Sequence, residues 1–255
     1  MPFSTEVRVN RAFAAEIKFF VNADRIEALR SWARARLGPD PYGGGPNGDT
    51  YKTNSLYFDT PEFDVYHRRG SYGRSKYRVR RYGHSTELFF ERKLKTRDLV
   101  SKRRSIVDER DLPRLANPEP AKGWPGHWFH RRILARDLDV VCQVAYTRTA
   151  LVHSNGDGPI RLTLDEQVVA QMILPSSQVE RASARVRPAF QDLSGGPRIA
   201  EGSAVLELKF YQALPAVFQQ LISEFALIQE PISKYRMSIA ALHLGQAAQS
   251  QEVTI

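Results

Sequence analysis

The sequence contains almost no cysteine and has no long hydrophobic run. Its 255 residues include a single cysteine, Cys142. One cysteine cannot form an intramolecular disulfide or supply a cysteine-based zinc site, so we expect a buried and unreactive thiol. No stretch approaches the length of a membrane-spanning helix, and the N-terminal residues lack the apolar core of a signal peptide. These absences predict a soluble, cytoplasmic protein with no membrane segment.

A phosphate-binding loop of the common nucleotide-binding type is also missing. The glycines of residues 41–48 are not followed by the Gly-Lys-Ser/Thr and the helix that such a loop needs. They run instead into an extended pattern over residues 50–59, which favours a flexible loop before a strand. Any phosphate chemistry in this chain is therefore expected to use another kind of site.

Acidic residues are the minority among the charged ones. The chain has 37 Lys and Arg against 28 Asp and Glu, which gives a formal net charge of +9. This excess points to an anionic partner, such as a nucleic acid, an acidic lipid or a phosphorylated small molecule. With 42% hydrophobic and 25% charged residues, the composition is typical of a globular protein. No linker interrupts residues 1–245, which predicts a single domain followed by a polar tail at 246–255.

The segment Glu87–Lys95 alternates in an unusual way. Successive side chains of a strand point to opposite faces, so Glu91, Lys93 and Lys95 share one face, whereas the other face is mostly apolar. The same Glu-x-Lys unit recurs at Glu16–Lys18 and at Glu207–Lys209. Three distant strands with the same pair of charges indicate one shared polar surface.

Similar alternation elsewhere, with turn-forming residues between the segments, predicts an antiparallel β protein with a few helices. The predicted strands are residues 12–21, 50–59, 76–82, 87–95, 100–106, 140–152, 160–169 and 204–210. Helices are predicted from Asn22 to about residue 37, from Pro215 to about 228 and from Ser233 through 244. Residues 108–138 are predicted to be helical and irregular, with His127 and His130 in a loop, and residues 175–197 have an ambiguous pattern.

The charged residues that alternate with apolar ones fall on one face of each predicted strand. They are Lys18, Arg78, Arg80, Lys93, Lys95, Lys102, Arg104, Arg148, Arg161 and Lys209, with Glu16, Glu91, Asp165 and Glu207 among them. One interpretation is that these are the solvated outer faces of an ordinary sandwich. However, the apolar faces must be buried, and the three predicted helices could cover them from outside. We therefore predict an α+β fold, in which a closed antiparallel barrel of about eight strands forms a basic tunnel and helices pack outside it.

A confined space lined by so many positive charges requires an anionic occupant, because like charges repel strongly at low dielectric. The guanidinium of an Arg side chain can donate two parallel hydrogen bonds to phosphate oxygens, whereas Lys acts as a point charge. The few carboxylates suit Mg²⁺ or Mn²⁺ bound together with substrate phosphates. The residues alone therefore favour a polyphosphorylated ligand and a divalent metal.

Several ordered pieces of the sequence carry a resemblance to a known family. They are Glu16–Phe19, Ser55–Asp59, Tyr66–Arg69, Arg78–Gly83, Glu91–Lys93, Lys102–Arg104, Tyr146–Ala150, Arg161–Asp165, Glu207–Lys209 and Ser233–Tyr235. The resemblance that they carry spans roughly residues 8 to 244. In these pieces the chain resembles the VTC (vacuolar transporter chaperone) domain family, the polyphosphate polymerase branch of the triphosphate tunnel metalloenzymes. The resemblance implies a basic antiparallel tunnel that binds triphosphates with a divalent metal.

The resemblance also implies roles for individual residues. Five residues are expected to act in catalysis by clamping phosphates: Arg78, Arg80, Lys93, Arg148 and Arg161. Seven are expected to bind substrate: Lys18, Arg69, Lys95, Lys102, Arg104, Lys209 and Lys234. Glu207 matches the metal-binding acid, and Glu91 and Glu16 are further candidates. One departure is Ala14, which stands where hydrolytic tunnel enzymes tend to have the first Glu of Glu-x-Glu-x-Lys.

Three functions remain open from the sequence. The first is transfer of the γ-phosphate of ATP to a polyphosphate chain, which needs no general base because the acceptor is already anionic. The second is hydrolysis of inorganic or nucleoside triphosphates on the same fold, which the replacement at Ala14 disfavours. The third is a non-catalytic polyphosphate-binding module. Nucleic acid is disfavoured as a partner because the bases alternate with apolar residues and no open face with stacking aromatics is indicated.

Overall fold

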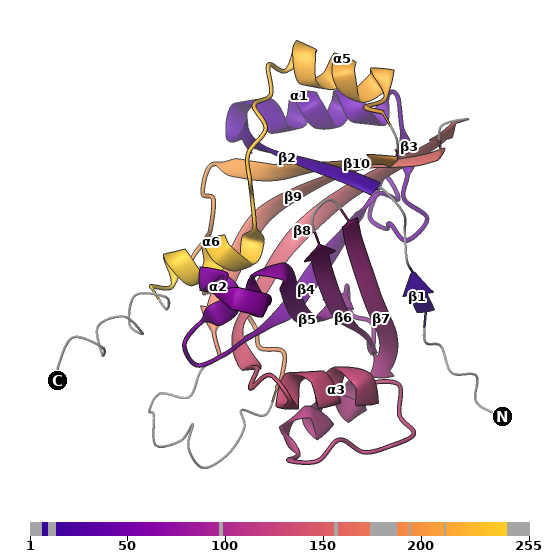
Figure 1. Ribbon diagram of the computed structural model, residues 1–255. Coiled ribbons are helices and arrows are strands. Elements are labelled where there is room, and N and C mark those ends of the chain that lie inside the picture. The colour runs from indigo at the N-terminus through magenta and orange to yellow at the C-terminus, as the bar shows by residue number, and fades with distance from the viewer. Residues whose placement is uncertain are drawn as a thin grey trace.

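The structure is a computed structural model that describes residues 7–9, 14–96, 99–155, 158–173, 188–193, 195–211 and 213–243. It contains one antiparallel sheet of ten strands, with helices around it (Figure 1). The strands are β1 (Val7–Val9), β2 (Ala14–Asn22), β3 (Gly38–Pro39), β4 (Thr50–Asp59), β5 (Ser75–Tyr82), β6 (Glu87–Thr96), β7 (Leu99–Asp108), β8 (Asp139–Asn155), β9 (Gly158–Met172) and β10 (Ser203–Tyr211). All eight predicted strands are present, which confirms the α+β class. The two strands that the alternation did not predict, β1 and β3, span only three and two residues.

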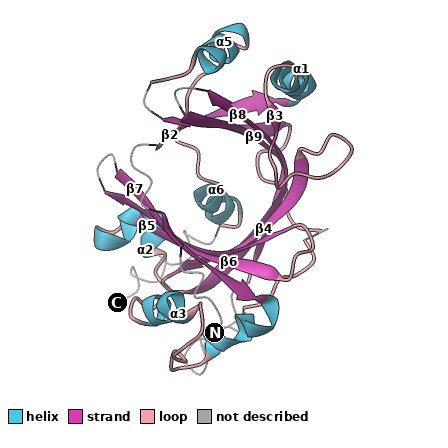
Figure 2. Cartoon of the chain, turned by 90° about the vertical axis from the view of Figure 1, so that its right-hand side faces the viewer, coloured by secondary structure: helices cyan, strands magenta, loops and turns pink. Residues whose placement is uncertain are grey.

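Nine of the strands form one continuous path in the order β1-β7-β6-β5-β4-β8-β9-β10-β2, and β3 pairs with β8 beside it. The two longest strands, β8 with 17 residues and β9 with 15, are neighbours in this path. The register shifts between Tyr57 and Phe58 and between Ala145 and Thr147, and such bulges bend strands and increase their twist. As a result the sheet is strongly curved (Figure 2). Among the described residues no pairing joins β1 to β2, so the strand path itself has two ends.

The structure contains five described α-helices and two short 3₁₀ helices. They are α1 (Ala23–Arg34), α2 (Asp64–His67), η1 (Gly70–Arg74), η2 (Glu109–Ala116), α3 (His127–Leu134), α5 (Ala216–Glu224) and α6 (Lys234–Ala241). The helices begin where predicted: α1 follows Asn22, whose side chain makes no capping hydrogen bond, α5 follows Pro215, and the hydroxyl of Ser233 accepts from the amide of Arg236 in α6. All three predicted helices end earlier than predicted, at Arg34, Glu224 and Ala241. In α5 the reason is local, because Ala226 adopts a left-handed conformation (φ 41°) that a helix cannot continue through.

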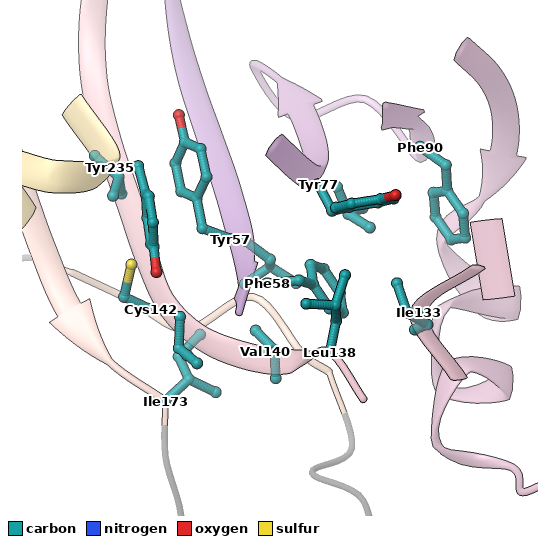
Figure 3. Packing of buried hydrophobic residues seen from close by; sticks show 14 of the residues in the cluster. Tyr57, Phe58, Tyr77, Phe90, Ile133, Leu138, Val140, Cys142, Ile173 and Tyr235 are labelled. Atoms are coloured by element: carbon teal, nitrogen blue, oxygen red, sulfur yellow. The ribbon is translucent and has the colours of Figure 1, made fainter. Parts of the chain in front are cut away.

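The buried apolar side chains pack in two clusters. One joins β4–β8 to α3, η2 and α6, and it includes Leu56, Val79, Phe90 and Phe129, all 0% exposed. Figure 3 shows Phe90 and Tyr235 among its members. Each fully buried side chain of this size stabilises the fold by roughly 1.5–3 kcal/mol. Cys142, also 0% exposed, belongs to this cluster, and burial raises the pKa of its thiol. The thiol is thus buried and held protonated, as expected.

The second cluster joins the convex face of β2, β9 and β10 to α1 and α5. It contains Leu29 from α1, Leu206 and Leu208 from β10, and Phe218 from α5, all 0% exposed. The two helices therefore cover this part of the sheet from outside, as the sequence predicts. None of the described helices combines the length and the apolar character that crossing a membrane requires.

Two details differ from the sequence-based prediction. His127 and His130 lie in the helix α3, not in a loop, and His130 is 0% exposed with its Nε2 3.0 Å from the carbonyl oxygen of Asn117. In addition, α6 does not pack outside the sheet. Figure 2 shows it inside the curve, while α1, α3 and α5 lie outside. The predicted tail 246–255 and residues 174–187 lie outside the described part of the chain.

Candidate active site

The strand register places the predicted charged residues on one face of the sheet. Across β5, β6 and β7, Arg78 pairs with Glu91, which in turn pairs with Arg104. At the other end of the path, Lys18 on β2 pairs with Glu207 on β10. Residues paired directly across neighbouring strands point to the same side. All three Glu-x-Lys units therefore belong to one surface.

This surface is the concave one, because residues from distant strands meet across it. Lys93 Nζ on β6 lies 2.5 Å from Glu16 Oε2 on β2, although five strands separate β6 from β2 along the sheet. Such a contact is possible only if the face that carries both residues curves inward. We call this face, with its charged residues on β2 and β4–β10, the concave face.

Glu91 is the most enclosed acid of the concave face. Its side chain is 2% exposed, and its two oxygens lie 2.7 Å from Arg78 Nε and 2.5 Å from both Lys102 Nζ and Arg104 Nη2. Burial alone would raise the pKa of Glu91, but the positive charges of Arg78, Lys102 and Arg80 outweigh it and hold that pKa well below its usual range. Both oxygens therefore serve as acceptors for bases, which leaves this carboxylate poorly suited to a metal ion.

Asp165 on β9 holds a second group of bases. Its carboxylate accepts two bonds from Arg148, at 2.6 and 2.8 Å, and its Oδ2 lies 2.5 Å from Lys234 Nζ. Asp165 is 0% exposed. Burial alone would raise the pKa of Asp165, but the charges of Arg148 and Lys234 lower it by more, so the net pKa shift is downward. The network ties the first residue of α6 to the concave face.

The start of α6 is anchored by further contacts. Lys76 Nζ on β5 donates to Ser233 Oγ at 2.8 Å, and the ring of Tyr235 stacks on Tyr57 with 5.2 Å between centroids. The Tyr235 hydroxyl donates to Asp59. Burial, together with the positive charges of Lys18 and other nearby bases, lowers the pKa of Lys76 to about 7. The helix thus covers one end of the concave face and brings the amine of Lys234 into it.

Glu207 and Glu16 differ from Glu91 in exposure and in the number of partners. Glu207 Oε2 lies 3.2 Å from Lys18 Nζ, and its side chain is 22% exposed. The side chain of Glu16 is 23% exposed. Because Glu207 pairs with Lys18 and Lys209 pairs with Glu16, the two acids are diagonal neighbours on adjacent strands. Carboxylates at this spacing remain within reach of one ion.

A divalent metal fits this second pair only with help from a substrate. In the described part of the chain no group of three or more His, Cys, Asp or Glu side chains is close enough to hold a metal. Mg²⁺, however, is commonly held by one or two carboxylates together with substrate phosphates and water. Glu207 and Glu16 satisfy that requirement, whereas Glu91 with its three bases does not.

Four predicted residues lie apart from these networks. Arg69 is 46% exposed at its side chain and pairs with Asp64 at 3.3 Å. Arg161 Nη2 lies 2.9 Å from Asp40 Oδ2 and donates to the hydroxyl of Tyr51 at 2.8 Å. Lys209 lies on the concave face between Glu16 and Arg161 in the register. The side chain of Lys95 lies outside the described residues.

The concave face also includes residues that were not among the sequence-based candidates. Lys76 and Tyr82 share the alternation of Arg78 and Arg80 on β5 but were not selected. Burial would raise the pKa of Tyr82, but the charges of Arg80, Arg104 and Lys102 lower it to about 7. Asp40 could not have been found from alternation, because it lies in a loop and meets Arg161 only in the folded chain.

Comparisons with known proteins identify the family of the chain and a similar fold. The family model of the VTC domain matches residues 13–243. A solved structure from Bacillus halodurans, described as a candidate adenylate cyclase, is similar with a TM-score of 0.51 and 14% identity over 88% of this chain and 96% of that one. The comparison with curated proteins found no match.

Two further solved structures are similar at lower scores. The PH1819 protein of Pyrococcus horikoshii has a TM-score of 0.47 and 12% identity over 90% of this chain and 99% of that one. A candidate adenylyl cyclase from Hippeastrum, described as having a dominant triphosphatase activity, has a TM-score of 0.48 and 13% identity over 90% and 96%.

Proposed function

Because the chain belongs to the VTC domain family of the triphosphate tunnel superfamily, we propose that it transfers the γ-phosphoryl group of ATP to the end of a polyphosphate chain. In this proposal the concave face closes around the substrate as a basic tunnel. The family is one of phosphate-processing proteins that bind triphosphates, and the transfer reaction is the more specific step that we infer.

The charge balance of the concave face carries the proposal. Its bases outnumber the four acids of its ion-pair networks by more than two to one, and each of these four acids pairs with at least one base: Glu16 with Lys93, Glu91 with Arg78, Lys102 and Arg104, Asp165 with Arg148 and Lys234, and Glu207 with Lys18. Such a surface neutralises phosphate charge well. It offers little general-base capacity, because nearby bases lower the pKa values of Glu91, Asp165 and Glu207.

This balance favours a phosphate acceptor over water. A terminal oxygen of polyphosphate attacks the γ-phosphorus of ATP, the bond from that phosphorus to the β,γ-bridging oxygen breaks, and ADP leaves with the electron pair. No proton has to be removed from the attacking group. The step therefore depends on positioning and on charge stabilisation, which side chains such as Arg78, Arg80, Lys93 and Arg148 are placed to supply.

The other residues have supporting roles in this proposal. Lys18, Lys102, Arg104, Lys209 and Lys234 contribute charge along the path of the phosphates. Arg161 binds near the rim, where Asp40 fixes it. When bound, Mg²⁺ or Mn²⁺ would be held by Glu207 and Glu16 and would neutralise charge on the transferring phosphates.

The test is to incubate the protein with ATP and Mn²⁺ and to resolve the products by gel electrophoresis and phosphorus NMR. Long polyphosphate together with ADP is the expected result. Orthophosphate as the only phosphate product would identify a hydrolase, and binding of polyphosphate without turnover would identify a binding module. Either of these two results contradicts the proposal.

Two adjacent residues of β5 provide a matched pair of variants. Arg80 lies on the concave face and donates to Ser55 Oγ at 3.0 Å, whereas Arg81 lies on the other face and pairs with Glu109 at 2.8 Å. We expect Arg80→Met to lower turnover by at least about tenfold and Arg81→Met to leave it nearly unchanged, since one lost contact to a charged group costs about 1.5–3 kcal/mol. Equal effects would show that the concave face is not where the reaction occurs.

A further inference from the structure

Three aromatic rings lie together on the concave face, which is otherwise charged. They are Tyr51 on β4, Tyr82 on β5 and Phe89 on β6. The ring of Tyr82 meets Tyr51 edge-on with 5.6 Å between centroids, and it meets Phe89 with 5.2 Å between centroids. Three strands thus contribute one aromatic cluster to a surface whose other groups suit phosphate.

These rings keep part of their surface exposed, unlike the apolar residues on the opposite face of the same strands. Tyr51, Tyr82 and Phe89 are each partly exposed. Leu88 and Phe90, which flank Phe89 along β6, are 0% exposed. The cluster is therefore not part of the hydrophobic core, and its accessible surface faces the same space as the bases.

The cluster lies at the end of the concave face that α6 leaves uncovered. Lys76, which contacts Ser233 just before α6, is six residues from Tyr82 along β5. At about 3.4 Å per residue this separates them by roughly 20 Å. Arg78 and Arg80 lie between them on the same face. A ligand lying along β5 would thus pass from the rings, over two guanidinium groups, toward α6.

Bases also surround the rings. The guanidinium of Arg80 lies 5.8 Å from the centroid of Tyr82, and that of Arg104 lies 4.5 Å from the centroid of Phe89. The hydroxyl of Tyr51 accepts from Arg161 at 2.8 Å, and Asp40 holds that arginine in place. Aromatic surface next to arginine is the combination on which proteins that bind single-stranded nucleic acids stack bases.

We propose that Tyr51, Tyr82 and Phe89 form the subsite for the base of the nucleoside triphosphate, so that the phosphates extend from the rings toward α6. This inference rests on the proposed function, because it concerns the donor of that reaction. Inorganic polyphosphate has no group that would use an aromatic surface, so the cluster distinguishes a nucleotide donor from a phosphate-only ligand. It also places the two substrates: the nucleotide enters at the aromatic end.

The test compares two ligands that share the phosphates and differ in the nucleoside. Binding of ATP and of inorganic tripolyphosphate is measured by titration calorimetry for the wild type and for Phe89→Ala, Phe89→Tyr and Ile106→Ala. Ile106 pairs directly with Phe89 on β7 and lies on the same face, so its truncation removes apolar surface at the same place without removing a ring. Circular dichroism and thermal melting check that each variant is folded.

We expect Phe89→Ala to weaken the binding of ATP by about five- to a hundredfold, which is the range typical of one lost stacking contact. The affinity for tripolyphosphate should be unchanged. Phe89→Tyr and Ile106→Ala should bind both ligands as the wild type does. In the wild type, purine triphosphates should bind more tightly than pyrimidine triphosphates, since the larger ring stacks over more surface.

Two results would overturn the inference while leaving the proposed function intact: equal affinity of the wild type for ATP and tripolyphosphate, or a Phe89→Ala variant that weakens both ligands equally. If Phe89→Ala does not fold, Tyr51→Leu is measured in the same way and must meet the same expectation. Failure of the wild type to bind either ligand would instead overturn the proposed function, and the inference with it.

Discussion

The two wings of the concave face use their acids in different ways. In the wing formed by β5, β6 and β7, Glu91 is enclosed by bases from both neighbouring strands. In the wing formed by β9, β10 and β2, three acids alternate with bases, and two of them, Glu16 and Glu207, keep about a fifth of their side-chain surface exposed. The first wing therefore carries a strong positive excess, and the second is closer to neutral.

The same short motif is present in both wings, so the motif does not decide the role of its acid. Glu91 and Glu207 each stand two residues before a lysine. Glu91 faces an arginine on each side, whereas Glu207 faces Lys18 on one side and Thr163 on the other. The residue opposite on the neighbouring strand determines whether the carboxylate is saturated by bases or remains available to a cation.

The largest expected difference between Glu91 and Glu207 is in how much the protein is destabilised when each is replaced by Gln. Glu91→Gln leaves three bases around a neutral amide, and we expect the free energy of unfolding to fall by about 2–4 kcal/mol; the lower part of this range allows for the partial exposure of those bases. Glu207→Gln, at a more exposed pair, should cost less than about 1 kcal/mol. Urea denaturation followed by circular dichroism measures both values. Equal losses in the two variants would mean that exposure and partner number do not distinguish these acids.

The next prediction tests whether Glu207, rather than Glu91, holds the metal on which turnover depends. Glu207→Gln should lower ATP turnover in Mn²⁺ by about a hundredfold, because a bound metal supplies several kcal/mol of charge stabilisation. Binding of tripolyphosphate without metal should persist or become tighter, since the variant removes a negative charge. Manganese titration of phosphate binding provides the measurement. If Glu207→Gln retained the manganese dependence of the wild type, the metal would have to be assigned to other residues.

Alternation in the sequence was sufficient to predict which face each charged residue occupies. Glu91 and Lys93 lie with Phe89 on one side of β6, and Leu88 and Phe90 are buried on the other, as the period of two requires. The starts of α5 after Pro215 and of α6 after Ser233 were also predictable, because the residue types act locally. These features depend on neighbours along the chain.

Contacts across the sheet could not be predicted in this way. The ion pair of Lys93 with Glu16 depends on how strongly the sheet curves over the five intervening strands. No local pattern in the sequence predicts that curvature. The position of α6 inside the curve follows from the contact of Lys234 with Asp165, two residues far apart in the sequence. The helix that contains His130 was hidden by the glycines and prolines before it, although Phe129 and Ile133 share one buried side at helical spacing.

A smaller difference is expected in tripolyphosphate affinity when one lysine from each wing is replaced. Lys102→Met removes a positive charge from the strongly basic wing, and Lys209→Met removes one from the more neutral wing. Because phosphates are expected to lie nearer the first wing, we expect about a tenfold loss of tripolyphosphate affinity for Lys102→Met and about threefold or less for Lys209→Met, with tenfold corresponding to roughly 1.4 kcal/mol. Titrations at two salt concentrations should show a shallower salt dependence for Lys102→Met. A larger loss for Lys209→Met would reverse the assignment of the wings.

The smallest effect concerns pH and the end of the basic wing that α6 covers. The pKa of Lys76 is about 7 because burial and the positive charges of Lys18, Lys93 and Arg78 disfavour its charged form. A bound polyanion would favour the charged form and raise this pKa, so binding takes up a proton. Affinity for tripolyphosphate should therefore be greatest below pH 7 and should decrease as the pH rises through 7, by up to severalfold near pH 8.

Lys76→Arg separates this effect from the titration of the phosphates themselves. The guanidinium stays charged across the range, so the variant should bind as the wild type does at pH 6 and more tightly than the wild type at pH 8. Calorimetry in two buffers of different ionisation enthalpy counts the protons taken up, and the wild type should take up more than Lys76→Arg near pH 7.5. The same uptake in both proteins would mean that Lys76 is already charged when the site is empty. The basic wing would then meet its ligand with its full charge.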